Sequence, residues 1–313
     1  MVKPKRKPKS KLKPQGKPKL VGAMHDPVGW VSERERTANR NGLDSRELYT
    51  SHRERLTSLV ASFGGPGKRL CLLGAGNCND VDLELLCEHF AEVHLVDIDD
   101  RAVAGAISRQ PEAIRGKLFA HAPFDLSGIF PALPALRALD ADGLIPPNVF
   151  AVELLKLVHA SSASLIARLP GPFDVCVSCC ISTQLSWALS EMLTREHPRL
   201  ETLRLSLMMV HLRVLLGLRK AEGGTSLWVS DVSSTSLYPI EDALKVVSPR
   251  ALLAQLLESG KVYSGGNPKM LESIQATDPS MAQSAPLEEY EPWLWKTKSR
   301  TYLVQAIRFS DRT

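Results

Sequence analysis

The stretch LCLLGAGNCND, residues 70–80, decides the fold of this chain. It begins within an apolar run, residues 69–73, that has the length and composition of a short buried strand. Gly74-Ala75-Gly76 follows at once, and residues 80–92 then repeat apolar residues at helical spacing. Because glycine carries no side chain, a strand that ends in Gly-x-Gly and enters a helix lets a ligand approach the backbone closely. The stretch therefore predicts a strand, a ligand-binding turn and a helix.

The same alternation of strand and helix continues along the chain, and we expect residues 21–43 and 261–288 to be irregular. Alternating strands and helices imply a parallel sheet with helices on both faces, and a late hairpin implies an antiparallel edge. Further strands are predicted at 93–99, 117–125, 173–180, 226–231, 292–296 and 301–309, and further helices at 44–63, 100–109, 148–169, 183–193, 198–219 and 250–260.

Composition divides the chain into a basic tail, an N-terminal helical cap and one large domain. We assign the tail to residues 1–22, the cap to 23–66 and a Rossmann-like domain to 67–311, with an insertion at about 126–147 that is rich in Pro, Leu and Ala. The net charge is +5, and residues 1–20 contribute +9 of it, so the rest of the chain carries −4. Lysine alternating with proline cannot bury a core, so we expect the tail to be disordered.

The tail and the apolar pattern set expectations about partners and location. Residues 1–20 could contact nucleic acid without reading its sequence, by neutralising phosphates. We find no apolar run of the ~20 residues that a membrane span needs, and no secretory signal. We therefore expect a cytoplasmic protein with no membrane partner.

The six cysteines are expected to be reduced and buried. Only Cys176, Cys179 and Cys180 are closely spaced, and no second Cys/His pair lies near them in the sequence to complete four ligands. No metal site is predicted.

An acidic residue follows the glycine turn at a spacing typical of nucleoside binding. Asp97 ends the second predicted strand, 21 residues after Gly76, where it could accept hydrogen bonds from ribose hydroxyls. A nucleoside triphosphate loop would need GxxxxGK[ST], which is absent. A dinucleotide site would need glycine where Asn79 stands, and Asp80 would repel a pyrophosphate. S-adenosylmethionine carries a sulfonium and an ammonium instead, so acids and amides at the turn favour it.

On these residues the chain resembles the class I S-adenosylmethionine-dependent methyltransferases. The resemblance rests on LLGAGNCND (72–80), VHLVDID (93–99), FDVCVSCC (173–180) and RTYLVQAIRF (300–309), and it covers about 45–311. It implies an α/β fold: a seven-stranded, mostly parallel, doubly wound sheet with an antiparallel C-terminal edge hairpin and an N-terminal helical cap. The sequence departs from the family pattern in two places, where Leu72 replaces a frequent acid and Cys78 stands at the third glycine position.

The resemblance also implies a cofactor site for S-adenosyl-L-methionine at the ends of four strands. The residues carried over are Gly74, Ala75, Gly76 and Asn77 for the methionine part, Asp97 for the ribose, Ile98 and Asp125 for the adenine, and Ser178 and Cys179 facing the transferred methyl.

Six residues are candidates for catalysis on the acceptor side. Tyr49, His52 and Arg53 share one helix face by their i, i+3, i+4 spacing, and an exposed polar face is the alternative. The other three are Gln184 and Asp231, each after a predicted strand, and His211, for which a core histidine is the alternative.

The acceptor itself has no readable motif. Enzymes of this family that methylate the amino group of adenine or glutamine often carry [DNS]-P-P-[YFW] after the fourth strand, and this place reads SCCIST (178–183). We therefore expect a small molecule or a protein side chain rather than a nucleic acid. Two other functions stay open: an NAD(P)-dependent oxidoreductase, and a non-catalytic protein of this fold that docks on nucleic acid through its tail.

Overall fold

The computed structural model describes residues 25–140, 144–193, 197–278, 281 and 284–311. The predicted basic tail, residues 1–22, lies outside them. The strands are β1 (Arg69–Leu73), β2 (Glu92–Val96), β3 (Leu118–His121), β4 (Val175–Cys179), β5 (Thr225–Ser234), β6 (Ser284–Glu289), β7 (Trp293–Lys296) and β8 (Thr301–Asp311). The helices are α2 (Pro27–Gly42), α3 (Thr50–Ala61), α4 (Leu83–His89), α5 (Asp100–Ser108), α6 (Glu112–Arg115), α7 (Leu133–Leu139), α8 (Pro147–Ala167), α9 (Ile181–Met192), α10 (Leu200–Gly217), α11 (Ile240–Ala243), α12 (Pro249–Glu258) and α13 (Pro268–Thr277), with 3-10 turns η1 (Leu43–Ser45), η2 (Phe130–Ala132) and η3 (Ser264–Gly266).

One sheet organises the described part of the chain, in the order β3-β2-β1-β4-β5-β8-β6. Strands β1 to β5 are parallel, and β8 runs antiparallel to β5. Strands β6 and β7 both pair with β8, as two consecutive pieces of one edge position. The sheet thus has seven positions, and the expected α/β fold is confirmed. The strand order reverses between β1 and β4, where open α/β sheets bind their ligands.

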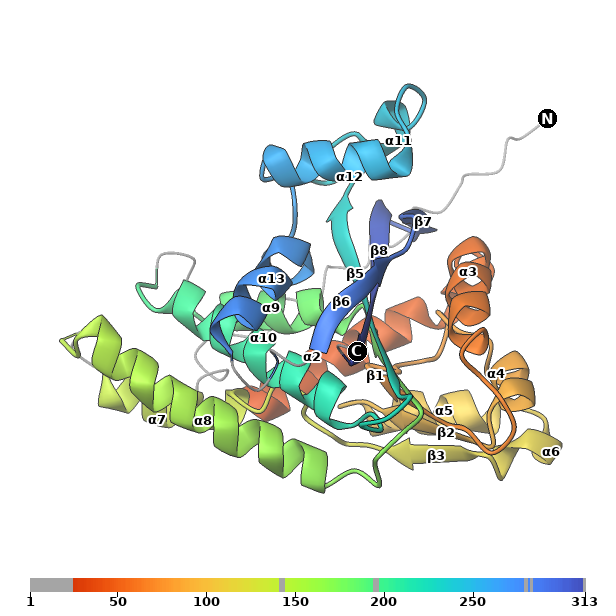
Figure 1. The fold of residues 1–313 in the computed structure, drawn as a ribbon, viewed down its shortest axis with the longest axis horizontal. Helices are drawn as coiled ribbons and strands as arrows, with labels where there is room; N and C mark the ends of the chain where they lie inside the picture. Colours follow the sequence, from red (N-terminus) through yellow and green to blue (C-terminus); the bar gives the residue numbers. More distant parts are fainter. Residues whose placement is uncertain (1–24, 141–143, 194–196, 279–280, 282–283, 312–313) are drawn as a thin grey trace, which may run out of the picture.

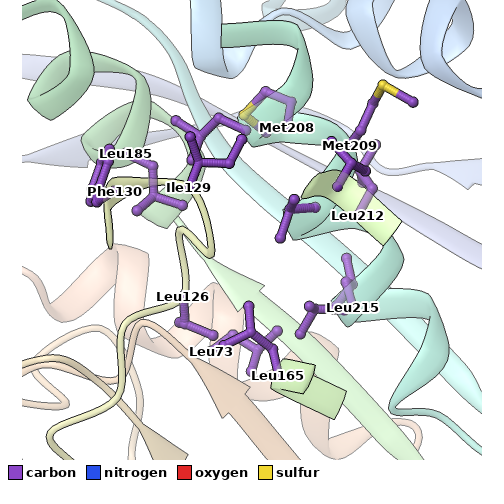
Figure 2. Packing of buried hydrophobic residues seen from close by; sticks show 14 of the residues in the cluster. Leu73, Leu126, Ile129, Phe130, Leu165, Leu185, Met208, Met209, Leu212 and Leu215 are labelled. Carbon is purple, nitrogen blue, oxygen red and sulfur yellow. The ribbon is translucent and has the colours of Figure 1, made fainter. Parts of the chain in front are cut away.

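Helices cover both faces of the sheet, α3 and α4 on one side and α8 and α10 on the other (Figure 1). The first core lies under α8, α9 and α10, and Figure 2 shows part of it: Leu73 from β1, Leu126 and Phe130 from the segment after β3, Leu165 from α8 and Leu215 from α10. The segment predicted as an insertion, 126–147, therefore contributes to this core.

The second core lies between the other face of the sheet and helices α3, α4 and α5. Leu72 belongs to it, while its neighbour Leu73 belongs to the first core, because successive side chains of a strand point to opposite faces. Leu56 of α3 and Leu86 of α4 are fully buried there.

Two expectations about local structure were wrong. Residues 21–43 were expected to be irregular, and α2 occupies most of that segment, with Asp26 accepting the amide hydrogen of Gly29 as an N-cap. Residues 261–288 were expected to be a loop, and they contain α13 and most of β6. Both helices begin with a capping residue followed by proline, Asp26-Pro27 and Asn267-Pro268, which is a local helix-start signal that the prediction missed.

The length and apolar composition of helix α8 depart from the expectation that the chain has no apolar segment long enough to span a membrane. Among the described residues it is the one helix long and apolar enough to do so, by length and composition alone. Leu154, Val158 and Leu165 belong to the first core, which accounts for part of this apolar composition.

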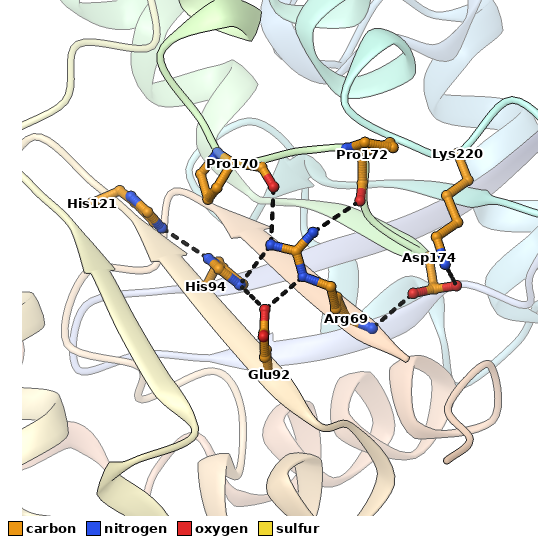
Figure 3. A network of polar contacts seen from close by, with 8 residues as sticks. All are labelled: Arg69, Glu92, His94, His121, Pro170, Pro172, Asp174 and Lys220. Atoms are coloured by element: carbon orange, nitrogen blue, oxygen red, sulfur yellow. Dashed lines mark hydrogen bonds and ion pairs between the residues drawn. The ribbon is translucent and has the colours of Figure 1, made fainter. Parts of the chain in front are cut away.

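An arginine ties together the amino ends of β1, β2 and the segment before β4 (Figure 3). Arg69 donates from Nε to Glu92 Oε2 at 2.5 Å and from its Nη atoms to the carbonyls of Pro170 (2.9 Å) and Pro172 (3.2 Å). Its guanidinium also lies over the ring of Phe173, 4.9 Å from the centroid. This network lies at the edge of the sheet opposite the glycine turn, so its role is to join strands.

Two further contacts extend the same network (Figure 3). His94 Nε2 lies 2.9 Å from the carboxylate of Glu92, and His94 Nδ1 lies 2.9 Å from His121 Nε2 on β3. Hydrogen bonds from His94 and Arg69 lower the pKa of Glu92. The amino edge of the sheet is therefore held by polar contacts from β1 to β3.

Candidate functional site

The glycine turn begins at the carboxyl end of β1, beside the reversal of strand order. Gly74 has φ +82° and Gly76 has φ +49°, in the left-handed region that favours glycine. A Cβ on Gly74 would lie 2.8 Å from Cβ of Ile181, so no other residue fits there without a shift. The amides of Gly74 and Ala75 donate to the carbonyl of Val96, which fixes the turn against the end of β2.

Asp97 binds this turn directly. Its Oδ2 accepts the amide hydrogen of Gly76 at 2.8 Å, and its Oδ1 accepts that of Asp99 at 2.8 Å. The side chain is only 8% exposed, and burial raises its pKa to about 6, against the lowering effect of the two amides. Each oxygen keeps a second lone pair, so Asp97 can still accept hydrogen bonds from a diol.

Ile98 and Asp125 are the two residues predicted at the adenine, and they follow β2 and β3 in the chain. Ile98 packs against the first core. Asp125 accepts hydrogen bonds from the amide and the hydroxyl of Ser127, at 2.8 and 2.9 Å, and burial raises its pKa. Asp125 thus stabilises its own turn in this structure, and its contact with an adenine stays a prediction.

Asn77 has a structural partner as well. Its Nδ2 donates to the carbonyl of Asn39 in α2 at 2.7 Å, and Arg109 Nη2 donates to the Asn77 carbonyl at 3.0 Å. Asn77 is therefore oriented toward α2, and its contact with a cofactor stays a prediction.

The side chains of Ser178 and Cys179, the two residues predicted at the end of β4, lie on opposite faces of the sheet. Ser178 Oγ lies 2.8 Å from His211 Nε2, and both side chains are fully buried. Burial lowers the pKa of His211 to about 4, so the imidazole is neutral and links β4 to α10. Cys179 belongs to the second core on the opposite face, and burial raises its pKa well above the ordinary value, so the thiol is neutral.

The candidates on the N-terminal helix meet the C-terminal hairpin. His52 Nδ1 accepts the indole hydrogen of Trp293 at 2.9 Å, and its ring stacks on Trp295 with centroids 4.8 Å apart. Tyr49, at the start of α3, meets Trp295 edge-on at 5.3 Å. His52 is 1% exposed, and burial lowers its pKa to about 3, so it is a neutral packing residue rather than a titrating base.

Arg53 and Gln184 occupy more open positions. Arg53 donates to the carbonyls of Arg46 and Asn79, at 2.5 and 3.3 Å, and so joins the N-terminal segment to the glycine turn. Gln184 is exposed on α9 and makes no hydrogen bond within the part of the chain described here.

Asp231 is the candidate best placed for proton transfer. It lies near the carboxyl end of β5, where a β-bulge between Asp231 and Ser233 shifts the pairing with β8. Thr183 Oγ1 donates to Asp231 Oδ1 at 2.5 Å, and burial raises the pKa of Asp231 to about 7. A carboxyl group with that pKa can gain or lose a proton near neutral pH.

The structure brings to Asp231 further residues that the sequence did not assign to the acceptor side. Burial raises the pKa of Asp80 to about 6. Burial also raises the pKa of Tyr49 and of Asp231, and the charge of Asp80 raises both further. Tyr302 of β8 stacks on Trp295 with centroids 5.2 Å apart, and burial raises its pKa. The sequence carried one signal for this aromatic cluster: side chains alternate along a strand, so Trp293 and Trp295 of the terminal hairpin share one face.

These residues form two groups at the carboxyl ends of the parallel strands. The first, beside β1 and β2, holds the glycine turn and Asp97. The second, called the acceptor-side group below, joins the ends of β1 and β5 to α3 and the hairpin; its members are Tyr49, Asp80, Thr183, Asp231, Trp295 and Tyr302.

Comparisons with known proteins give similarity in structure alone. No family model matches the chain, and no curated protein matches it. An rRNA methylase from Streptococcus thermophilus is 9% identical with a TM-score of 0.37, over 83% of this chain and 95% of that chain. An O-methyltransferase from Bacillus cereus in complex with SAH is 10% identical with a TM-score of 0.40, over 88% and 90%.

A third solved structure carries a different activity in its name. The precorrin 8w decarboxylase from Methanobacterium thermoautotrophicum is 10% identical with a TM-score of 0.36, over 82% of this chain and 88% of that chain. Two of these three structures are methyltransferases by name. At these identities and TM-scores the similarity assigns neither an activity nor an acceptor to this chain.

Proposed function

We propose that the chain is an S-adenosyl-L-methionine-dependent methyltransferase (EC 2.1.1.-). The observation that carries the proposal is the contact between the glycine turn and the acid after β2, Gly76 N–H to Asp97 Oδ2 at 2.8 Å. It lies at the reversal of strand order, where a ligand of an open α/β sheet binds.

The charges around the turn fit this cofactor better than a dinucleotide. Asp97 and Asp99 lie at the turn, and Glu35 of α2 lies close enough to raise the pKa of Asp97. Negative charge opposes a pyrophosphate and stabilises a cation. When bound, S-adenosylmethionine supplies a methyl group on a positively charged sulfur, and its leaving group is neutral.

The chain's own residues would hold the reactants and move a proton. Gly74 and Gly76 would let the backbone lie against the methionine part, and Asp97 would hold the ribose hydroxyls. Alignment of the acceptor with the methyl group supplies much of the rate of such a transfer. Asp231 would take the proton of the acceptor, held in place by its hydrogen bond from Thr183.

The acceptor belongs to the proposal only as a class. A small molecule or a protein side chain is favoured over nucleic acid, because SCCIST (178–183) stands where enzymes that methylate the amino group of adenine often carry [DNS]-P-P-[YFW]. Residues 1–20 would add salt-dependent contact with nucleic acid, and a cytoplasmic location is part of the same proposal.

Calorimetric titration of the protein with S-adenosylmethionine, S-adenosylhomocysteine and NADPH tests the proposal, with Asp97→Ala measured alongside. We expect micromolar binding of the first two and loss of binding in the variant. Binding of NADPH alone would support an oxidoreductase instead. Transfer of a labelled methyl group to any acceptor in a lysate would exclude a non-catalytic binding protein.

A further inference from the structure

Helix α2 crosses the carboxyl edge of the sheet on the side of the predicted cofactor. Its N-terminal half is anchored in the first core by Val31, with Val28 and Trp30 packed against that core. Its C-terminal half then passes the ends of β2 and β1. The inward positions Val31, Glu35 and Asn39 are four residues apart, as expected of one helix face.

The C-terminal half of α2 is held by polar contacts with the site itself. Asn39 Nδ2 donates to Asp99 Oδ2 at 2.9 Å, and Arg36 Nη2 donates to Asp100 Oδ1 at 3.1 Å. The site also donates to the helix. Asn77 Nδ2 donates to the carbonyl of Asn39 at 2.7 Å, and Asn79 Nδ2 donates to the carbonyl of Gly42 at 2.9 Å.

The side chain of Asn39 also lies beside the glycine turn. Its Oδ1 lies 3.1 Å from the position that a Cβ on Gly76 would occupy. The face of the turn that a side chain would fill is thus covered by α2. A cofactor that lies along Gly76 therefore lies next to Asn39.

The same half of the helix is poorly anchored by apolar packing. The buried residues of α2 are Pro27 and Val31, both in its N-terminal half. Glu35 lies partly buried beside Arg34 and Asp99, and burial raises its pKa, so opening of the helix would rehydrate a carboxyl group. Segments with few buried apolar contacts open locally at a free energy far below that of global unfolding.

We propose that the C-terminal half of α2, residues 35–42, is a gate over the cofactor site, fastened by Asn39 to the glycine turn and to Asp99. This inference rests on the proposed function, because it takes S-adenosylmethionine as the occupant. Cofactor enters and product leaves when the Asn39 and Arg36 contacts are broken. The N-terminal half of α2 stays anchored in the first core. The segment would move at the 3-10 turn after Gly42, where Asp44 leaves helical geometry (φ −87°, ψ 16°).

The test is the rate of S-adenosylhomocysteine binding to the full chain, measured by stopped-flow fluorescence. Asn39→Ala removes the fastening, and Asn41→Ala, an exposed asparagine of the same helix, is the matched control. Loss of one hydrogen bond shifts an opening equilibrium about fivefold. A gate predicts that the association and dissociation rate constants both rise by about that factor in Asn39→Ala and stay unchanged in Asn41→Ala.

Two outcomes would overturn the gate in different ways. If only the dissociation rate rises in Asn39→Ala, then Asn39 is an ordinary ligand contact and access is not limited by α2. If the wild-type chain binds neither S-adenosylmethionine nor S-adenosylhomocysteine, the proposed function fails, and the gate fails with it.

A measurement without ligand separates the gate from the function. In hydrogen exchange of the free protein, amides of residues 37–42 should exchange at least tenfold faster than those of β1, and faster still in Asn39→Ala. Exchange of residues 37–42 as slow as that of β1 would show that the helix opens only with global unfolding, and the gate would be wrong.

Discussion

Asp97 accepts the amide hydrogen of Gly76 at 2.8 Å, so the acid after β2 and the glycine turn after β1 form one unit. The two residues are 21 positions apart and are joined through adjacent strands. The contact orients one carboxylate oxygen against the turn and, through Asp99, the other against the start of α5. A ligand that Asp97 binds would therefore lie beside the turn.

Asp97→Asn should weaken cofactor binding while keeping the shape of the side chain. The amide loses the charge and cannot accept hydrogen bonds at both of its former oxygens. Hydrogen bonds to charged groups contribute about 1.5–3 kcal/mol, so the dissociation constant for S-adenosylmethionine should rise roughly 10- to 100-fold. Calorimetry measures it, with the exposed Asp242→Asn as control. Equal affinities of Asp97→Asn and wild type would contradict the role of Asp97.

Asp231 should set the pH dependence of methyl transfer. A general base acts in its ionised form, and burial places the pKa of Asp231 at about 7, so the rate should rise with pH through that value. Asp231→Asn should lower the rate by about 10²- to 10⁴-fold. Thr183→Val, which removes the hydrogen bond that lowers this pKa, should move the profile to higher pH, and Thr183→Ser should not. A profile unchanged by Thr183→Val would argue against Asp231 as the base.

Asp80 should lower the stability of the folded chain at neutral pH. Its pKa is about 6 in the folded state against 3.8 for an ordinary aspartate, so between those values the folded state binds the extra proton. Its contribution to stability therefore falls as pH rises from about 4 to 6. Asp80→Asn should be more stable than wild type by about 1–3 kcal/mol at pH 8, and the gain should vanish below pH 4. Urea denaturation at several pH values measures this, and a gain independent of pH would contradict it.

Gly74→Ala should destabilise the fold more than an alanine at another positive-φ glycine. The new Cβ would sit 2.8 Å from Cβ of Ile181, whereas a Cβ on Gly67 (φ +74°) would meet no atom within 4 Å. Backbone strain costs about 1–2 kcal/mol at either site, and overpacking adds about 1–3 kcal/mol at Gly74. Denaturation of both variants checks the difference. Equal losses would mean that contact with Ile181 is not what requires glycine.

Arg69→Gln should loosen the amino edge of the sheet without affecting cofactor binding. The change removes the ion pair with Glu92 and leaves the carbonyls of Pro170 and Pro172 without their donor. We expect a loss of about 1–3 kcal/mol in the free energy of unfolding, against almost none for the exposed Arg250→Gln. Weaker cofactor binding in Arg69→Gln would show that the two edges of the sheet are coupled.

Local patterns in the sequence determined the order of most strands and helices. Short apolar runs between helical repeats predicted β1, β2, β4 and β5, and Gly-x-Gly with Asp97 predicted where the candidate site lies. Such signals depend on residues close together in the chain, so they are readable without a structure. Local signals were also present for α2 and α13, where Asp26-Pro27 and Asn267-Pro268 each place a capping residue before a proline, but the prediction missed them.

Only the tertiary structure decided what surrounds the site. Three examples are the approach of Asn39 to Gly76, the hydrogen bond between His52 and Trp293, and the effect of Asp80 on Asp231. They join residues from 37 to 241 positions apart. Burial then sets the chemistry, since it makes His52 and His211 neutral and brings Asp231 close to neutral pH. Burial and pairing of this kind are properties of the packed chain, because they depend on which side chains exclude water from a group, and no local pattern in the sequence records that.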